Sequence, residues 1–310
     1  MRVEEELAGL SPEKDMVLTI GVFDGVHLGH KYLLSQLKEH ARAQNLMSGV
    51  VTFHQHPKEM LSPGMEMPHL TSLEEKVRLL KGEGVEAVVT LSFTSELAQL
   101  SAGQFVGLLM KHLRMRSLVI GPDFALGRNR EGNADVLREL GQEMGFSVIV
   151  IAPVKVNSEV VSSTAIRYAL EQGNMKRVIS LTGRSFSLQG LITTGAGRGT
   201  GLGFPTANLE IDPGQTVPAN GVYATWANID GKAYRAVTNI GRRPTFGGNG
   251  RTVETFILDY QGNLYGCEMK IDIVERLRDE KHYDTVEELK KQIAEDLKKG
   301  RDILDNSTGQ

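Results

Sequence analysis

Residues 16–152 alternate short apolar runs with longer segments of helical periodicity, and this alternation constrains the fold more than any other feature. We expect strands at residues 17–22, 48–54, 87–92, 118–120 and 147–152. Helical spacing predicts helices at residues 31–44, 73–82, 102–113 and 133–144. Repeated strand–helix–strand units of this kind predict an α/β fold with a doubly wound parallel sheet.

After about residue 181 the pattern changes. Glycine, proline and asparagine punctuate short β-branched runs at residues 221–227, 234–240, 252–259 and 268–274, which predicts a small antiparallel barrel or sandwich. An apolar stripe through Val286, Leu289, Ile293, Leu297 and Leu304 predicts a docked amphipathic helix at residues 285–304. We therefore expect two unlike modules, residues 1–183 and residues 184–310.

The length and the charge distribution limit the classes of partner. At 310 residues the chain is long enough for two domains that each bury a core. The formal net charge is −3, and residues 1–183 hold 19 of the 35 Lys and Arg and 21 of the 38 Asp and Glu. Neither module is a polycation, so net charge gives no support to nucleic-acid binding.

Cysteine usage and hydropathy indicate the compartment. The single cysteine, Cys267, excludes an internal disulfide, which fits a reducing compartment. The acidic N-terminus lacks the pattern of a signal peptide, and the apolar runs are far shorter than the ~20 residues of a membrane span. We expect a soluble cytoplasmic protein without a membrane partner. No unexplained apolar stripe argues for a homo-oligomer, and the oligomeric state stays open.

Two histidines follow the first expected strand, where a helix begins. His27 and His30, with Gly25 and Gly29 beside them, share one face once the first helical turn forms, and unpaired N–H groups there attract anions. Two donors at this place can stabilise a transferring phosphate. A bare His-x-x-His pair is more often two surface residues, but the strand and the glycines favour phosphate chemistry here.

Two further clusters follow later strands of the same module. Residues 121–130 combine small residues with Arg128 and Arg130, which can reach phosphates, although an ordinary turn with exposed arginines fits equally well. Residues 162–167, after a sixth strand-like segment at 155–161, place Ser163, Thr164 and Arg167 at a helix start. Alone this is a well-capped helix, but at a sheet exit it predicts a second wall of the cleft that begins at the histidines.

In the second module a glycine-dense loop precedes a Pro-Thr-Ala-Asn tetrad. Backbone N–H groups of residues 195–203 can wrap nucleotide phosphates, although a glycine-rich run alone is often just a turn. The Thr206 hydroxyl and the Asn208 amide are oxygen ligands suited to Mg²⁺. Glu254 lies on an expected strand whose neighbouring residues face away from it, and a solvent-facing glutamate and a functional one fit the pattern equally.

Together these motifs resemble, over nearly the whole chain, the prokaryotic bifunctional riboflavin kinase/FAD synthetases. Residues 21–30 resemble the HxGH motif of the nucleotidyltransferase superfamily, and residues 121–130 and 162–167 resemble the other clusters of the flavin-adenylylating module. Residues 205–208 resemble the PTAN motif of riboflavin kinases, and residues 239–246 resemble their NIGxRPTF loop. Residues 276–283 resemble the RxRDEKKF flap, with His282 and Tyr283 in place of Lys-Phe.

The resemblance implies a fold and two reactions. The fold is a nucleotidyltransferase sheet followed by a riboflavin-kinase barrel with a C-terminal helix. The second module then phosphorylates riboflavin to FMN with ATP, and the first adenylylates FMN with ATP to give FAD and pyrophosphate. Mg²⁺ is the implied cofactor, and the implied partners are riboflavin, FMN, FAD and ATP. The alternatives are a single-activity FAD synthetase or riboflavin kinase, and a non-catalytic flavin-binding regulator.

The resemblance also implies residue roles. His27 and His30 serve adenylyl transfer, Glu254 is the base that takes the proton of the ribityl hydroxyl, and Thr206 and Asn208 hold the metal. The further ATP- or flavin-binding residues are Gly21, Phe23, Asp24, Gly25, Gly29, Asp123, Phe124, Gly127, Arg128, Ser163, Thr164, Arg167, Gly197, Gly199, Gly201, Gly203, Pro205, Asn239, Arg242, Arg278 and Glu280. Two stretches depart from the family pattern: residues 53–57 lack one proline, and Ala125-Leu126 stand where Arg-Phe is frequent.

Overall fold

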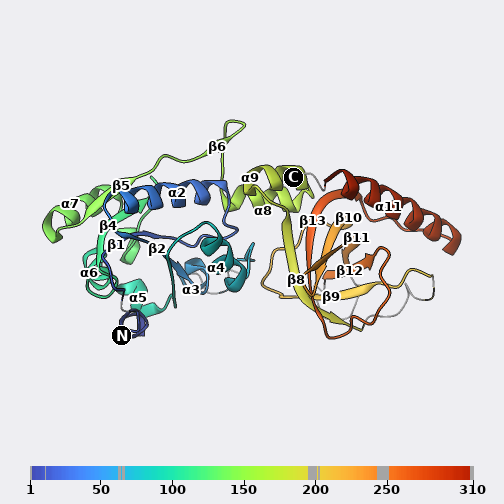
Figure 1. The fold of residues 1–310 in the computed structure, drawn as a ribbon, viewed down its shortest axis with the longest axis horizontal. Coiled ribbons are helices and arrows are strands. Elements are labelled where there is room, and N and C mark those ends of the chain that lie inside the picture. The colour runs from blue at the N-terminus through green and yellow to red at the C-terminus, as the bar shows by residue number, and fades with distance from the viewer. Residues whose placement is uncertain are drawn as a thin grey trace. The chain divides into compact units, whose positions relative to one another are not determined.

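The computed structural model describes residues 2–10, 12–61, 64, 67–194, 201, 203–242 and 251–307. The chain forms two compact units, Met1–Ser163 and Thr164–Gln310 (Figure 1). The division falls directly after Ser163, the first residue of α8 (Ser163–Glu171), and before α9 (Met175–Thr182). The sequence pattern instead assigned all residues up to 183 to the first module.

The first unit contains the predicted parallel sheet. Its five strands lie in the order β3-β2-β1-β4-β5, and every neighbouring pair is parallel. The strands are β1 (Met16–Ile20), β2 (Met47–Phe53), β3 (Ala87–Leu91), β4 (Met115–Ile120) and β5 (Ser147–Val150). The α/β prediction for this half is therefore confirmed, and the order places β1 and β4 side by side at the centre.

Helices cover both faces of this sheet, because its strands bury side chains in both directions. Met16, Leu18 and Ile20 of β1 join one apolar cluster and Val17 joins the other. The first cluster contains residues of α1 (Arg2–Ala8), α5 (Ser95–Gln99), α6 (Ala102–Leu113) and α7 (Ala134–Met144). The second contains residues of α2 (Leu28–Ala43) and α4 (Leu73–Gly82). The short helix α3 (Pro57–Leu61) has no buried residue.

Local sequence fixes the helix ends. The Ser101 and Gln104 side chains form a reciprocal capping box at the start of α6, and the Asn133 side chain accepts from two backbone N–H groups at the start of α7. The latter helix ends at Gly145, which adopts the left-handed conformation at φ 83° that glycine tolerates best.

One expected strand is wrong. Residues 155–161 do not add a sixth strand to the sheet but form a hairpin of β6 (Lys155–Val156) and β7 (Glu159–Val160). Asn157 and Ser158 connect them with φ values of 49° and 67°. Positive φ at both central residues is the signature of the hairpin turn that matches strand twist, and that turn chemistry outweighs the β-branched residues around it.

The second unit resolves the choice between barrel and sandwich. Six antiparallel strands close into a barrel in the order β10-β11-β12-β9-β8-β13. They are β8 (Phe186–Thr193), β9 (Ala207–Ile211), β10 (Gly221–Ile229), β11 (Lys232–Arg242), β12 (Arg251–Ile257) and β13 (Glu268–Arg278). Closure pairs every strand on both sides, so no edge remains exposed.

Helix α11 (Val286–Ser307) packs on the outside of the barrel (Figure 1). Leu304 joins Val222, Val237 and Leu277 in one buried cluster, and a Cβ atom at Gly300 would lie 2.7 Å from Val237 Cγ2. The predicted docked helix is confirmed, but its apolar stripe is buried mainly in the second half. Val286 at its start remains 50% exposed.

The barrel interior carries a short polar chain as well as apolar side chains. The hydroxyl groups of Thr225, Thr238 and Thr255 follow one another at 2.9 Å and 3.0 Å, and all three residues are fully buried. Because side chains alternate along a strand, the residues next to these threonines point outward, toward the face that α11 partly covers.

Candidate active sites

The two histidines occupy the start of α2, directly behind β1. His27 is the N-cap residue, with φ −80° and ψ 175°, and its Nδ1 accepts from the His30 backbone N–H at 3.3 Å. The two imidazole rings stack with centroids 3.6 Å apart and planes 14° from parallel. The predicted common face is confirmed. Because His27 Nδ1 is an acceptor, the proton of the neutral ring lies on Nε2, which makes that atom a donor.

The loop before the histidines is closely packed. Phe23 is buried, and the edge of its ring meets His30 at a centroid distance of 5.0 Å. Gly25 has φ 80°, and a Cβ atom there would lie 2.8 Å from Leu70 Cδ1. A Cβ atom at Gly29 would lie 3.1 Å from the His27 ring. The positive φ of Gly25 therefore requires glycine, and a side chain at Gly29 would press on the His27 ring, so both positions favour glycine beside the histidines.

Asp24 holds the chain rather than facing outward. The residue is 6% exposed, and its carboxylate accepts from Leu70 N at 2.9 Å and from Thr71 N at 3.3 Å. Gly25 N donates to Thr71 Oγ1 at 3.2 Å. These bonds join residues 70–71 to the histidine loop, so they give Asp24 a structural role beside the binding role that the family resemblance implies.

A buried lysine lies beneath the same loop. Lys76 of α4 is 6% exposed, and its Nζ donates to the Phe53 carbonyl, at the end of β2, at 2.8 Å. Burial lowers the pKa of Lys76, and the negative charge of Asp24 acts in the opposite direction. This role was not predicted, because a lysine on an amphipathic helix is ordinarily a solvated residue.

The second predicted cluster leaves β4, the neighbour of β1. The chain passes to opposite sides after these two strands, toward β2 and toward β5, so both loops lie at the topological switch point of the sheet. Arg128 Nε lies 3.4 Å from Glu131 and Arg130 donates to the Asp123 carbonyl at 3.0 Å, with both arginines and Asp123 exposed. Gly127 has φ 77°.

The apolar residues of this cluster face inward. Phe124 packs against the first-unit core, and Leu126 is buried in it with 7% exposure. At the departure from Arg-Phe, Leu126 stands in place of the phenylalanine and is accepted by the core. Ala125 stands in place of the arginine at a position that is only partly buried.

One residue of the third cluster, Ser163, forms a hydrogen bond with the histidine loop. Ser163, the first residue of α8, donates from its hydroxyl to the Asp24 carbonyl at 2.9 Å. Thr164 and Arg167 follow on the same helix but belong to the second unit. Within the first unit, the structure therefore brings Ser163 to the backbone of the loop that carries His27 and His30.

In the barrel, strand register gathers residues from four motifs in one row. Asn208 of β9 pairs with Glu254 of β12, Glu254 pairs with Asn239 of β11, and Val222 of β10 pairs with both Asn239 and Arg278 of β13. Residues directly opposite one another project to the same face. Val253 and Thr255 are buried inside, so Glu254 and its row lie on the outer face, as the alternation predicted.

A cavity lies beside this row. It has a volume of about 590 Å³ and is lined by Gly203, Pro205, Thr206 and residues 255–257 and 259–265. Phe204 packs edge-on against Phe256 at a centroid distance of 5.9 Å, which holds the tetrad segment against β12. The volume is in the range of sites that take a drug-sized or cofactor-sized ligand.

Two charged residues of the flap motif, Arg278 and Glu280, already have partners within the chain. Arg278 Nε and one terminal nitrogen bind the Asp296 carboxylate of α11 at 2.8–3.0 Å, and the other terminal nitrogen donates to the Asp279 carbonyl. Asp296 is 6% exposed, and Glu280 accepts from Asn220 Nδ2 at 2.8 Å. Asp296 was not predicted as a functional residue, because the periodicity of the helix identifies only its apolar positions.

Some of the remaining predicted site residues lie within the part of the chain that the structure describes, and others lie outside it. Gly201 and Arg242 are exposed, Gly203 has φ 88°, and Arg242 pairs with Arg251 across β11 and β12. Gly197, Gly199 and residues 243–246 of the loop motif lie outside the described residues. Among the described residues, no three His, Cys, Asp or Glu side chains gather as a metal site. Within the same part of the chain, no helix is both long and apolar enough to cross a membrane.

Comparison with known proteins gives a consistent result for both units. A family model described as FAD synthetase matches residues 10–165, and one described as riboflavin kinase matches residues 182–304. The bifunctional riboflavin kinase/FMN adenylyltransferase of Escherichia coli (strain K12) is 37% identical over 95% of this chain and 94% of its own length. The protein of the same description from Pseudomonas fluorescens is 36% identical over 97% of each chain.

A solved structure extends the likeness to three dimensions. The crystal structure of a Streptococcus pneumoniae protein, described as a macrolide-efflux protein, covers 97% of each chain with a TM-score of 0.90 and 31% sequence identity. That description concerns the other protein. The likeness here is one of sequence and backbone across both units.

Proposed function

This chain belongs to the bifunctional riboflavin kinase/FMN adenylyltransferase family, and we propose that each of its two reactions takes place at one of the two sites described above. It phosphorylates riboflavin to FMN, and it transfers an adenylyl group from ATP to FMN to form FAD. We place the adenylyl transfer at the histidine loop of the first unit and the phosphorylation on the outer face of the barrel.

The stacked pair His27 and His30 supports the first assignment. In adenylyl transfer an oxygen of the FMN phosphate attacks the α-phosphorus of ATP, and pyrophosphate leaves. Negative charge builds on the transferring group, and preorganised donors at a helix N-terminus stabilise it without reorganising. The protein forms no covalent bond in this step, so positioning and electrostatics supply the rate enhancement.

The row of polar residues on the barrel supports the second assignment, and Glu254 at its centre carries it. The ribityl hydroxyl oxygen attacks the γ-phosphorus of ATP, ADP leaves, and the Glu254 carboxylate accepts the hydroxyl proton. A carboxylate can act as this base only within hydrogen-bond reach of the hydroxyl. Its register partners Asn208 and Asn239 set amide groups on both sides of it, where they can orient the two substrates.

The donors beside the cavity fit a magnesium ion. Thr206 offers a hydroxyl oxygen and Asn208 an amide oxygen, and Mg²⁺ in such sites takes one or two protein oxygens together with substrate phosphates and water. Thr206 also lines the cavity, where we place ATP with Gly203 and Pro205. When bound, the ion offsets charge on the β- and γ-phosphates.

Two further assignments rest on the same support. The match to the FAD synthetase model ends at residue 165, and the match to the riboflavin kinase model begins at residue 182. We keep residues 1–183 and 184–310 as the functional modules, and most of α8 and of α9 lies between the matched parts. We also place the protein in the cytoplasm, where its substrate ATP is made and a chain with the single cysteine Cys267 needs no oxidising compartment.

One incubation tests the proposal. The full chain is mixed with riboflavin, ATP and Mg²⁺, and the flavins are separated by chromatography over time. We expect FMN to appear first and FAD to follow. Formation of FMN alone, or of FAD only when FMN is supplied, would indicate a single activity. Recovery of unchanged riboflavin from folded protein would indicate a flavin-binding regulator and contradict the proposal.

A further inference from the structure

Two arginines, Arg251 and Arg276, surround the segment that leads into β10. Arg251, the first residue of β12, donates to the carbonyl groups of Val217 and Pro218. Arg276 of β13 donates to the Asn220 carbonyl. Burial lowers the pKa of the Arg251 guanidinium, so the acceptors around it matter more than they would at the surface.

Asn220 is the residue on which these contacts converge. Its Oδ1 accepts from Arg251 at 2.9 Å, and its Nδ2 donates to Glu280 Oε2 at 2.8 Å. An arginine can only donate, and a carboxylate can only accept. The two partners therefore fix the orientation of the amide, because a flipped amide would set its NH₂ group against Arg251 and its oxygen against Glu280.

Glu280 in turn closely contacts the end of β11. A Cβ atom at Gly241 would overlap the Glu280 carboxylate, so the carboxylate takes this position only because residue 241 has no side chain. Gly241 lies two positions beyond Asn239, and Arg251 lies three positions before Glu254. The Asn220 amide thus joins the segment after β13 to the ends of β11 and β12 that carry Asn239 and Glu254.

We propose that Asn220 is a positioning residue for riboflavin phosphorylation: its amide bridges Arg251 and Glu280 and holds residues 278–280 against the β11–β12 ends beside Glu254. The proposal rests on the assignment of the phosphorylation to the barrel. We assign Asn220 no contact with a substrate or with the reacting atoms. It acts through the strands and the flap segment that it connects.

A change of the amide to a carboxylate tests the bridge. Asn220→Asp keeps an acceptor for Arg251 but replaces the donor to Glu280 with a like charge. We expect kcat/KM for riboflavin phosphorylation to fall roughly tenfold, mostly through KM, which matches the loss of one hydrogen bond to a charged group. Adenylylation of supplied FMN by the same chain should be unchanged.

A second substitution should restore the bridge. In the double variant Asn220→Asp/Glu280→Gln, the new glutamine can donate to the new aspartate, so we expect kcat/KM to lie within about threefold of that of Glu280→Gln alone. This comparison still tests the bridge if Asn220→Asp alone fails to fold, because the double variant removes the repulsion. A tenfold loss between Glu280→Gln and the double variant, or wild-type kinetics in Asn220→Asp, would overturn the proposal.

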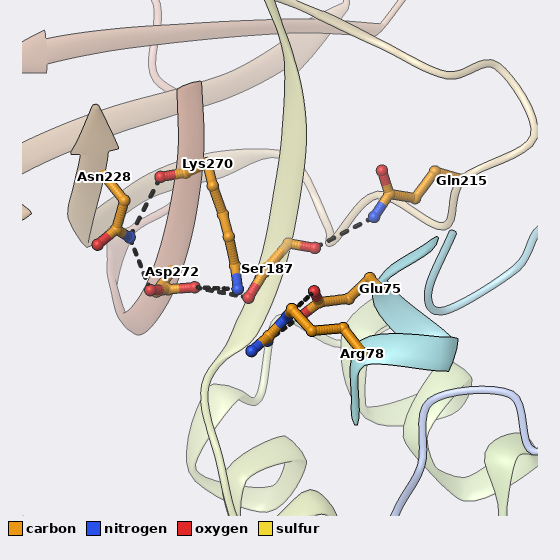
Figure 2. A network of polar contacts seen from close by, with 7 residues as sticks. All are labelled: Glu75, Arg78, Ser187, Gln215, Asn228, Lys270 and Asp272. Atoms are coloured by element: carbon orange, nitrogen blue, oxygen red, sulfur yellow. Dashed lines mark hydrogen bonds and ion pairs between the residues drawn. The ribbon is translucent and has the colours of Figure 1, made fainter. Parts of the chain in front are cut away.

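Asn228, on strand β10, which Asn220 directly precedes, offers a matched control. Its Nδ2 donates to Asp272 Oδ2 at 2.8 Å and to the Lys270 carbonyl at 3.3 Å, in a network that also contains Ser187 (Figure 2). Asn228→Asp makes the same chemical change against another carboxylate, away from the predicted row. An equal loss of phosphorylation in this variant would show a general effect on the barrel and refute the role of Asn220. Wild-type protein that forms no FMN would instead refute the proposed function.

Discussion

In the first unit both histidines lie on the first turn of α2, whereas in the second unit Asn208, Glu254 and Asn239 come from three strands that are well separated in the sequence. The helix start sets the histidine geometry locally, through an N-cap and two close-packed glycines. In the second unit, the register of the barrel strands aligns Asn208, Glu254 and Asn239 in one row. Slipping β12 by one residue would turn Glu254 into the interior, so the second site depends on the whole barrel in a way that the first does not.

The supports of the two sites differ in the same sense. In the first unit Asp24 and Lys76 bind backbone groups of nearby loops. In the second unit Arg278 and Asp296 join a strand to α11, and Arg251 and Asn220 join two strand ends. Damage to a support should therefore stay local in the first unit and spread through the barrel in the second.

The largest expected effect separates the two reactions. His27→Ala/His30→Ala should lower the rate of FAD formation by on the order of 10³-fold, because it removes the donors at the helix start. FMN formation, measured in the same reaction by chromatography, should stay near wild type. His40→Ala, at the other end of α2, is the control and should leave both rates unchanged. Equal loss of both activities in the double variant would contradict the separation of the sites.

The reverse experiment targets the barrel. Glu254→Gln keeps the shape of the side chain but removes the base, so kcat for FMN formation should fall by about 10²–10⁴-fold. Adenylylation of supplied FMN should persist. The control Glu268→Gln changes an exposed glutamate at the start of β13 and should alter neither reaction. Kinase turnover near wild type in Glu254→Gln would remove this residue from its assigned role.

A smaller effect sharpens the difference between local and spread supports. Lys76→Met leaves the Phe53 carbonyl without its Nζ donor and removes a positive charge that interacts with Asp24, which should lower the free energy of unfolding of the first unit by about 1–3 kcal/mol. Peptide-resolved hydrogen exchange can follow this loss separately in each unit. Lys81→Met, exposed on the same helix, should change it by less than about 0.5 kcal/mol. Loss of protection in the barrel would argue against a local effect.

The smallest expected effect is at the amino-terminal ends of the strands, opposite the ends that lead to the histidine loop. Hydrogen bonds from Arg116 and Arg114 to the Asp15 carboxylate, at the start of β1, hold the pKa of Asp15 below its usual 3.8. A lowered carboxylate pKa stabilises the fold above the unfolded value, and this stabilisation is lost as the pH falls through the folded value.

The corresponding variant is Asp15→Asn, and its urea midpoint should lie slightly below wild type at pH 7. The difference should shrink as the pH falls below about 4, where Asp15 is protonated in the unfolded chain, and should disappear once the pH is low enough to protonate Asp15 in the folded chain as well. FAD formation at pH 7 should be unaffected, since the site lies at the other ends of the strands. A difference that stays constant down to pH 2 would show that the ion pair is not its cause.

How much the sequence determined follows from the range of each interaction. Apolar alternation and helical spacing predicted the parallel sheet, its helices and the docked C-terminal helix, and the strand-to-helix junction predicted that His27 and His30 share a face, because these features depend on neighbouring residues. The turn formed by Asn157 and Ser158 is also local, but it was hidden by the β-branched residues beside it.

Only the tertiary structure decided the rest. Whether the second half closes as a barrel, which residues share a row with Glu254, and that Asp296 and Asn220 bind Arg278 and Arg251 all depend on strand register and on α11. Contacts between distant segments leave no periodic mark in a single sequence. They are fixed by the joint packing of all the strands, and one sequence shows the groups that can pair but not the pairs that form.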